Sequence, residues 1–232
     1  KLVFGLLITI GLVFTACNDD DGYSLNDVWI GFGMISGEEP GSYQIIMDSK
    51  DVLVPVAASY PGWQNDFENG DRALINYTIL DEDLNEDGTV SSYYVKVNHI
   101  EDVLMKGVMD ITEENADSIG YDAIIVDKFW MTDSLLNFKL KYWGYNGMHF
   151  LNLVKQPGDL TEDSQPIQLE IRHNANEDDE SIPYTAFVSF SLNEIRVEGL
   201  DSVSFEFFWT DYDGVEHSKV EVYNYEDLEL PM

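Results

Sequence analysis

The chain has 232 residues, of which 44 are acidic and 12 are basic, so its formal net charge at pH 7 is −32. Such a charge repels phosphate backbones and anionic headgroups, which excludes nucleic acid and anionic lipid surfaces as electrostatic partners. With 44% hydrophobic residues, the chain is apolar enough to fold into one large or two small domains.

The first element is an apolar segment, residues 2–13, which is too short for a membrane span and has the length of a signal-peptide core. Small residues, Thr15 and Ala16, precede Cys17, the single cysteine, although Phe14 stands where leucine is commoner. This pattern is typical of a bacterial lipoprotein signal. We expect residues 1–16 to be removed and Cys17 to be lipidated; the alternative is an ordinary cleaved signal followed by a chance cysteine. A single acyl chain holds a protein at a membrane only marginally. A fully processed lipoprotein carries two or three chains, so we expect its membrane anchoring to be permanent.

Three aspartates, Asp19 to Asp21, follow the cysteine. They resemble the acidic signal that sends Bacteroidetes lipoproteins to the outer cell surface, and the alternative is a solvated tether. We expect residues 17–26 to form an acidic tether and the protein to face the exterior from the outer membrane. Once Cys17 is lipidated, no thiol remains for a disulfide, a metal site or a nucleophile.

Period-two alternation with short turns predicts an all-β fold. The first half indicates five strands, within residues 28–34, 43–47, 52–56, 73–79 and 93–97, followed by a short helix at 99–106. These elements define a first domain over residues 27–106. Residues 107–121 are polar, acidic and lack the alternation, which predicts a linker.

The second half alternates again, within residues 136–142, 148–154, 167–171, 187–192, 203–209 and 215–223. Asn146-Gly147 lies between the first two runs and predicts a tight hairpin. Asp213-Gly214 predicts another turn. Strands at this spacing predict a β-sandwich over residues 122–228.

Several segments resemble the NigD-like lipoproteins of Bacteroidetes. They include Trp29 and the stretches 43–45, 76–80, 94–98, 114–120 (ENADSIG), 151–154 and 170–175 (EIRHNA). The resemblance covers about residues 26–226, and it implies an OB-like five-stranded barrel followed by a β-sandwich. The family takes its name from a member linked to a bacteriocin gene cluster. The resemblance does not identify any catalytic residue in this sequence.

No catalytic constellation emerges from the motifs. The four histidines, His99, His149, His173 and His217, lack the spacing of a zinc helix, and a packing role is expected for His173. Carboxylate pairs are too numerous to be informative. The sequence contains neither a Gly-x-Ser-x-Gly motif nor a phosphate loop, so we expect no enzyme and no cofactor.

One short segment is a candidate calcium site. Asp83, Asn85 and Asp87 precede Gly88 with the spacing of the first half of a calcium loop, but the twelfth position is Tyr94 instead of glutamate. An acidic hairpin turn is the alternative. The acidic loop 177–180 is expected to be solvated, with loose cation binding as its alternative.

Aromatic residues near predicted loops form the best candidate binding site. Tyr60, Trp63, Trp143 and Tyr145 could stack on a sugar, or they could cover the edges of the core. OB folds bind nucleic acid or sugars, and the charge removes the first option. We therefore expect a non-catalytic binding role, with a glycan or a protein partner, the latter including a bacteriocin-associated one; a hydrolase is the third hypothesis.

Three serines stand in Asp-Ser-aliphatic triplets that resemble the O-glycosylation acceptor of Bacteroidetes. They are Ser118, Ser134 and Ser202. If these serines are glycosylated, they must lie at exposed turns.

Overall fold

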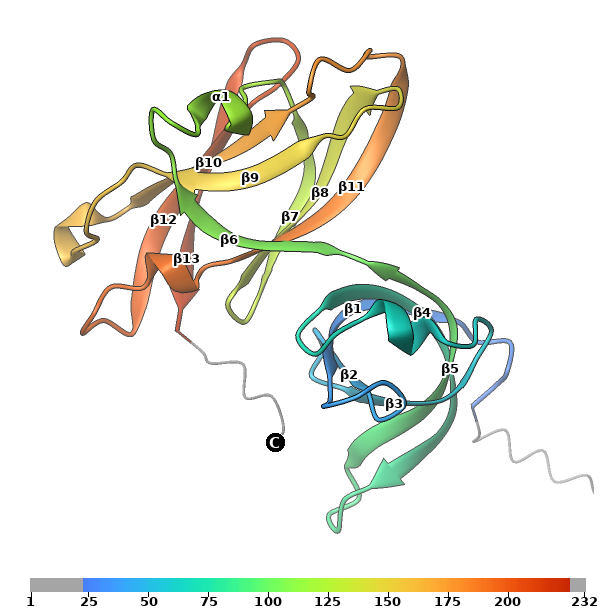
Figure 1. The fold of residues 1–232 in the computed structure, drawn as a ribbon. Helices are drawn as coiled ribbons and strands as arrows, with labels where there is room; N and C mark the ends of the chain where they lie inside the picture. The colour runs from blue at the N-terminus through green and yellow to red at the C-terminus, as the bar shows by residue number, and fades with distance from the viewer. Residues whose placement is uncertain (1–22, 226–232) are drawn as a thin grey trace, which may run out of the picture.

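The computed structural model describes residues 23–225 and shows an all-β chain of two domains (Figure 1). The first domain is a closed barrel in the order β1-β2-β3-β5-β4. Its strands are β1 (Trp29–Ser36), β2 (Gln44–Met47), β3 (Val52–Ala58), β4 (Arg72–Leu84) and β5 (Val90–Asp102). The five predicted strands are thus confirmed. β3 pairs with β5 in parallel, and the other neighbours are antiparallel.

Alternate side chains of these strands fill the barrel, as the period-two pattern requires. Ile35, Ile45 and Ile75 are completely buried there. A short 3₁₀ helix, Trp63–Asp66, packs against the barrel core through Trp63, whose ring meets Phe67 edge-on at 5.9 Å. Trp63 therefore belongs to the core of the barrel.

The second domain is an eight-stranded sheet in the order β13-β12-β10-β9-β6-β11-β8-β7, folded over one core. The strands are β6 (Leu104–Asp110), β7 (Ile125–Thr132), β8 (Leu135–Gly144), β9 (Phe150–Lys155), β10 (Ile167–Asn174), β11 (Ile182–Ser191), β12 (Ser202–Thr210) and β13 (Glu216–Asn224). The helices are α1 (Ala116–Ile119) and two 3₁₀ helices, Glu162–Ser164 and Asn193–Ile195. The sheet folds back on itself: Phe129 of β7 packs on Phe207 of β12 at 4.9 Å. This is the expected β-sandwich.

Strand β6 holds the two halves of the sandwich together (Figure 1). It pairs with β11 through residues 104–107 and with β9 through residues 108–110. Only Val103 separates it from β5 of the barrel. The predicted helix at 99–106 is therefore wrong. Residues 107–110 of the predicted linker are the end of β6, and residues 116–119 form α1.

The predicted Asn146-Gly147 hairpin is also wrong. β8 pairs with β7 and β11, whereas β9 pairs with β6 and β10. A tight two-residue hairpin of the usual type requires positive φ angles, and neither Asn146 nor Gly147 has one. The segment instead carries the chain from one half of the sandwich to the other.

The turn at Asp213-Gly214 is confirmed, because β12 and β13 form an antiparallel pair around it and Gly214 has φ 72°. Among residues 23–225, no helix is both long and apolar enough to cross a membrane.

Candidate functional site

The outer face of β7, β8 and β11 is where the sandwich meets the barrel. The inner face of these strands is apolar and fills the core, so the alternate positions point outward. The cross-strand register places Lys128 opposite Lys139, and Trp130 opposite Asn137. Beside them on β11 are Phe187 and Ser189, which pair with Lys139 and Asn137. The barrel contributes Phe32, Asp48 and Arg72 to this joint.

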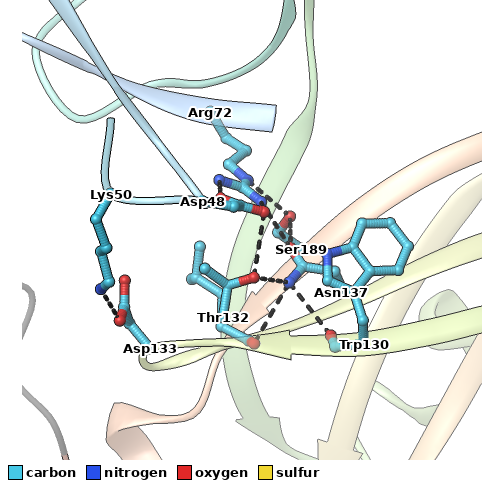
Figure 2. A network of polar contacts seen from close by, with 9 residues as sticks. Asp48, Lys50, Arg72, Trp130, Thr132, Asp133, Asn137 and Ser189 are labelled. Carbon is cyan, nitrogen blue, oxygen red and sulfur yellow. Dashed lines mark hydrogen bonds and ion pairs between the residues drawn. The ribbon is translucent and has the colours of Figure 1, made fainter. Parts of the chain in front are cut away.

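Arg72 is the centre of the joint and is only 1% exposed (Figure 2). Its guanidinium donates to both carboxylate oxygens of Asp48, at 2.5 and 2.7 Å. It also donates to Asn137 Oδ1 at 3.1 Å and to Ser189 Oγ at 3.3 Å, both in the sandwich. A buried charge needs this degree of pairing, because an unpaired one costs several kcal/mol, on the order of 3–5. Arg72 thus joins the two domains.

Two turns complete the polar network of the joint. Thr132 Oγ1 donates to Asp48 Oδ2 at 3.1 Å. Lys50 of the β2–β3 turn forms an ion pair with Asp133 of the β7–β8 turn. Lys50 and Asp133 have positive φ angles of 75° and 50°, so each lies at a tight corner where its side chain can reach the other domain. Figure 2 shows these contacts converging from both domains.

An aromatic cavity of about 410 Å³ opens beside this network. Its lining residues are Phe32, Lys128, Trp130, Lys139 and Phe187. The ring of Phe32 lies 5.2 Å from both Trp130 and Phe187, and Lys128 lies over the Trp130 ring at 5.6 Å. No carboxylate lines the cavity, although the chain as a whole is strongly acidic. We refer to these five residues as the junction cavity.

Asp127 organises the lysines beside the junction cavity. It accepts from Lys141 at 2.6 Å and pairs with Lys139 at 2.9 Å. The Lys141 and Lys139 ammonium groups hold the pKa of Asp127 below its usual value. Lys128 has no ion pair among the described residues, so its charge is available to a ligand.

A second cluster lies at the end of the sandwich and consists of His149, His173 and Asp178. His149 Nδ1 is 2.8 Å from His173 Nε2, and His149 Nε2 is 3.2 Å from Asp178 Oδ2. His173 Nδ1 donates to Ala123 O at 2.9 Å, which leaves its Nε2 as an acceptor. His149 Nδ1 is then the donor to His173 Nε2.

Burial and hydrogen bonding shift the pKa values of His173 and Asp178. His173 is 1% exposed, and desolvation lowers its pKa. The backbone N–H of Tyr145, above all, lowers the pKa of Asp178 far below its usual value. The side chains of His149 and Asp178 are 5% and 6% exposed. The sequence predicted that the acidic loop 177–180 is solvated, and for Asp178 this prediction is wrong. The Asp178 carboxylate instead accepts hydrogen bonds from the backbone of residues 145 and 146 and fixes that loop.

The structure does not bring the four predicted aromatics together. Trp63 is 1% exposed in the barrel core, which leaves no ring face for a ligand. Trp143 is half-buried against Tyr212, at 4.7 Å between ring centroids. Tyr60 and Tyr145 are exposed, but they lie on different domains. The aromatics that do converge are Phe32, Trp130 and Phe187.

The predicted calcium residues form the β4–β5 hairpin turn. Asp87 Oδ1 accepts from the backbone and hydroxyl of Thr89, at 3.0 and 2.6 Å, and the pKa of Asp87 is lowered by these bonds. Asn85 donates to Thr89, and Asp83 accepts from Tyr94 at 2.6 Å. Within residues 23–225, no three His, Cys, Asp or Glu side chains are grouped to hold a metal ion.

The three candidate glycosylation serines differ in accessibility. Ser118 is exposed on α1, and Ser202 is half-buried at the start of β12. Ser134 is 5% exposed, so a transferase could not reach it in the folded protein. Cys17, the signal peptide and the three aspartates lie outside the described residues.

Both domains match known protein families. Residues 33–103 match the NigD-like N-terminal OB domain, and residues 107–223 match the NigD-like C-terminal beta sandwich domain. No curated protein matches the chain.

Several solved structures share the fold. A protein described as toxin-related, from Parabacteroides distasonis, is 28% identical with a TM-score of 0.70, over 86% of this chain and 95% of that one. A NigD-like immunity protein from Bacteroides caccae is 18% identical with a TM-score of 0.63, over 85% and 94%. A protein described as a lipoprotein, from Bacteroides fragilis, is 12% identical with a TM-score of 0.59, over 88% and 100%.

Proposed function

This chain belongs to the NigD-like family, and from that premise we propose that it is a lipid-anchored binding protein that holds a protein partner at the joint between its domains. The observation that carries the proposal is the junction cavity, which combines three aromatic rings and two lysines in an acidic protein. Ligand sites occur preferentially where domains meet. Arg72 and Asp48, both in the barrel, fix the two sides of the cavity through their hydrogen bonds with Asn137, Ser189 and Thr132 of the sandwich.

The anchor in this proposal is Cys17, with residues 1–16 removed and the acidic tether leading to the barrel. The pattern of small residues before the cysteine supports it. The Bacteroides fragilis structure described as a lipoprotein has the same fold. We place the protein on the outer membrane, facing the exterior. Replacing Cys17 with serine should release it from the membrane fraction.

The role is binding without catalysis. The His149–Asp178 pair resembles part of a proton relay, but both side chains are at most 6% exposed, so a substrate does not reach them. A relay also needs a nucleophile within hydrogen-bond reach, and His149 instead contacts His173. These groups fix the loop at 145–147.

The partner should present an apolar side chain next to a carboxylate. Aromatic anchors that fill a pocket dominate protein interfaces, and Trp130 with Phe32 supplies such a pocket. Lys128 and Lys139 would pair with the carboxylate. The toxin-related and immunity descriptions of two similar structures support a partner of the protein class, as does the bacteriocin link of the family name.

Site-specific photo-crosslinking in living cells tests this proposal. A photoreactive amino acid in place of exposed Lys128 should capture one protein, and the same group in place of exposed Lys219, on β13, should not. Lys128→Glu should abolish co-purification of the captured protein, because it reverses the charge beside the cavity. Equal capture at both positions, or retention by Lys128→Glu, would refute the junction cavity as the binding site.

A further inference from the structure

A second cavity, of about 390 Å³, lies on the outer face of the sandwich between α1 and strands β6, β9 and β10. Its lining residues are Lys106, Met109, Asn115, Ser118, Ile119, Phe150, Asn152, Asn174 and Asn176. It shares no residue with the junction cavity. The segments 114–120 and 170–175, which carry the strongest family resemblance, both contribute to it.

The charge of this cavity is opposite to that of the chain. None of its lining residues is acidic, although the chain contains 44 acidic residues, and Lys106 is its single charged group. Lys106 Nζ donates to Leu151 O and to Asn152 Oδ1, each at 3.0 Å. An ammonium group has three donors, so one remains for a ligand. Burial lowers the pKa of Lys106, as expected for a cation with no carboxylate beside it.

Asn152 supplies a second donor. Its Oδ1 accepts from Lys106, and no acceptor for its Nδ2 is found among residues 23–225. Asn152 is only 8% exposed, but its Nδ2 is not among the fully buried, unpartnered side-chain atoms of the described residues. An acceptor that enters the cavity can therefore reach this N–H. Two adjacent donors, one of them charged, match the two oxygens of a carboxylate.

The rim of the cavity is rigid and amide-rich. Asn115 accepts from Thr112 N at 2.7 Å and donates to Asp110 O at 2.9 Å. Asn174 donates to Ser118 O at 2.8 Å, which fixes α1 against β10. The exposed Asn176 has a side chain free to bond hydroxyl groups, because no contact to its amide is found among the described residues.

An aromatic ring lies next to these amides. Phe150 is 39% exposed, Met109 is 38% exposed, and Phe150 pairs across the strands with Asn174. A ring flanked by amide groups fits a pyranose, since the apolar face of the sugar covers the ring while its hydroxyls meet the amides. A peptide carboxylate would not need this row of amides.

We propose that this cavity binds an acidic saccharide, with the carboxylate of a uronic acid on Lys106 Nζ and Asn152 Nδ2 and the sugar ring on Phe150. The site is independent of the junction cavity. It gives a lipid-anchored surface protein a means of contact with acidic polysaccharide while a protein partner occupies the joint.

Calorimetric titration of the purified full chain tests the proposal. The probes are the trimer of galacturonic acid, the neutral galactose trimer, and acetate. We expect binding of the acidic trimer, with at least tenfold weaker binding of the neutral trimer and of acetate. Equal binding of the two trimers would overturn the carboxylate role, and acetate binding as tightly as the acidic trimer would overturn the saccharide role. Absence of binding by every probe would overturn the site.

Variants separate this site from the rest of the molecule. Phe150→Ala and Asn176→Ala change exposed side chains, and each should weaken the binding of the acidic trimer several-fold. Lys106→Met should abolish this binding. Lys96→Met on β5 and Lys128→Glu at the junction cavity should leave it unchanged. Unaltered affinity in Phe150→Ala and Lys106→Met would refute the proposal, and loss in Lys128→Glu would place the sugar at the joint instead.

Discussion

At the scale of single residues, the joint depends on one buried charge. Arg72 has a completely buried side chain, whereas the side chain of Asp48 is 23% exposed. The guanidinium also meets the ring of Phe32, at 5.5 Å from its centroid. Arg72 therefore specifies how the domains fit together through its hydrogen bonds to Asn137 and Ser189 of the sandwich.

Asp48→Asn should lower the free energy of unfolding by about 3 kcal/mol, because Arg72 would remain buried without its counter-charge. The matched control is Asp133→Asn, which breaks the ion pair with exposed Lys50 and should cost less than about 1 kcal/mol. Asparagine also tolerates the positive φ at position 133. Urea unfolding of the purified protein measures both changes. Equal losses would mean that Arg72 finds another partner.

The sequence alone could not predict which side chains pair in the joint and in the histidine cluster. With 44 acidic residues, nothing singles out Asp48 as the partner of Arg72 or Asp178 as the partner of His149. His149 and His173 are 24 positions apart in different strands, so only the fold brings them together. The predicted packing role of His173 agrees with its burial.

The buried His173 predicts a pH dependence of stability. The pKa of His173 is lowered in the folded state, so the unfolded chain binds its proton first as the pH falls. Stability should therefore decrease as the pH falls below about 6.5. Because the pKa of Asp178 is also lowered in the folded state, a second loss of stability should occur below about pH 4. The groups that face His173 are His149, Tyr142, Asp122 and Glu180.

Urea unfolding between pH 5 and 8 checks the histidine effect. His173→Gln should be less stable at pH 8, since it loses ring packing against Tyr142, but its stability should change less between pH 7 and pH 5. The exposed His99 offers a control, because His99→Gln should keep the wild-type slope. The same slope in His173→Gln would show that another group carries the dependence.

At the scale of elements, local sequence signals were overridden by tertiary contacts. β7 escaped prediction because a bulge between Val126 and Lys128 shifts its alternation by one residue. β6 lacks a clear pattern because each of its halves pairs with a different neighbour. The strong Asn-Gly signal failed because residues 145 and 146 donate their N–H groups to the Asp178 carboxylate. β12, which the alternation did predict, has one continuous buried face.

Helix α1 depends on one glycine. Gly120 ends it with φ 75° and ψ 178°, a conformation that is essentially restricted to glycine. A Cβ at this position would lie 2.6 Å from Asn174 Cβ and 2.8 Å from His173 O. Gly120→Ala should therefore lower the unfolding free energy by about 3 kcal/mol, as strain and steric overlap act together.

Gly214 gives the matched control. Its φ is 72°, yet a Cβ there would meet open space, so Gly214→Ala should cost only about 1 kcal/mol. Thermal and urea unfolding of both variants separate backbone strain from overlap. A loss in Gly214→Ala as large as that in Gly120→Ala would mean that the contact of α1 with β10 contributes little.

At the scale of the whole molecule, two separate cores are combined into one unit. The barrel and the sandwich each have their own buried cluster. They are connected by the short β5–β6 junction, by the polar network around Arg72 and by the aromatic rings of the junction cavity. The sequence predicted both architectures but not their relative arrangement, because the residues that set it are scattered over β1, β4, β7, β8 and β11.

Removing the contacts of the joint should loosen the domains without unfolding either one. Spin labels at exposed Ser42 in the barrel and exposed Asn146 in the sandwich, in a chain with Cys17→Ser, should give one narrow distance distribution. Phe32→Ala combined with Arg72→Ala removes the aromatic contacts and the Arg72 hydrogen bonds to Asn137 and Ser189, and the distribution should broaden. The distance distribution between labels at Asn146 and Asp213, both in the sandwich, should stay narrow in the same variant. A narrow barrel–sandwich distance in the variant would mean that the β5–β6 connection, the Lys50–Asp133 ion pair and the Thr132–Asp48 hydrogen bond are sufficient to hold the domains. The junction cavity could then be altered without changing the domain arrangement.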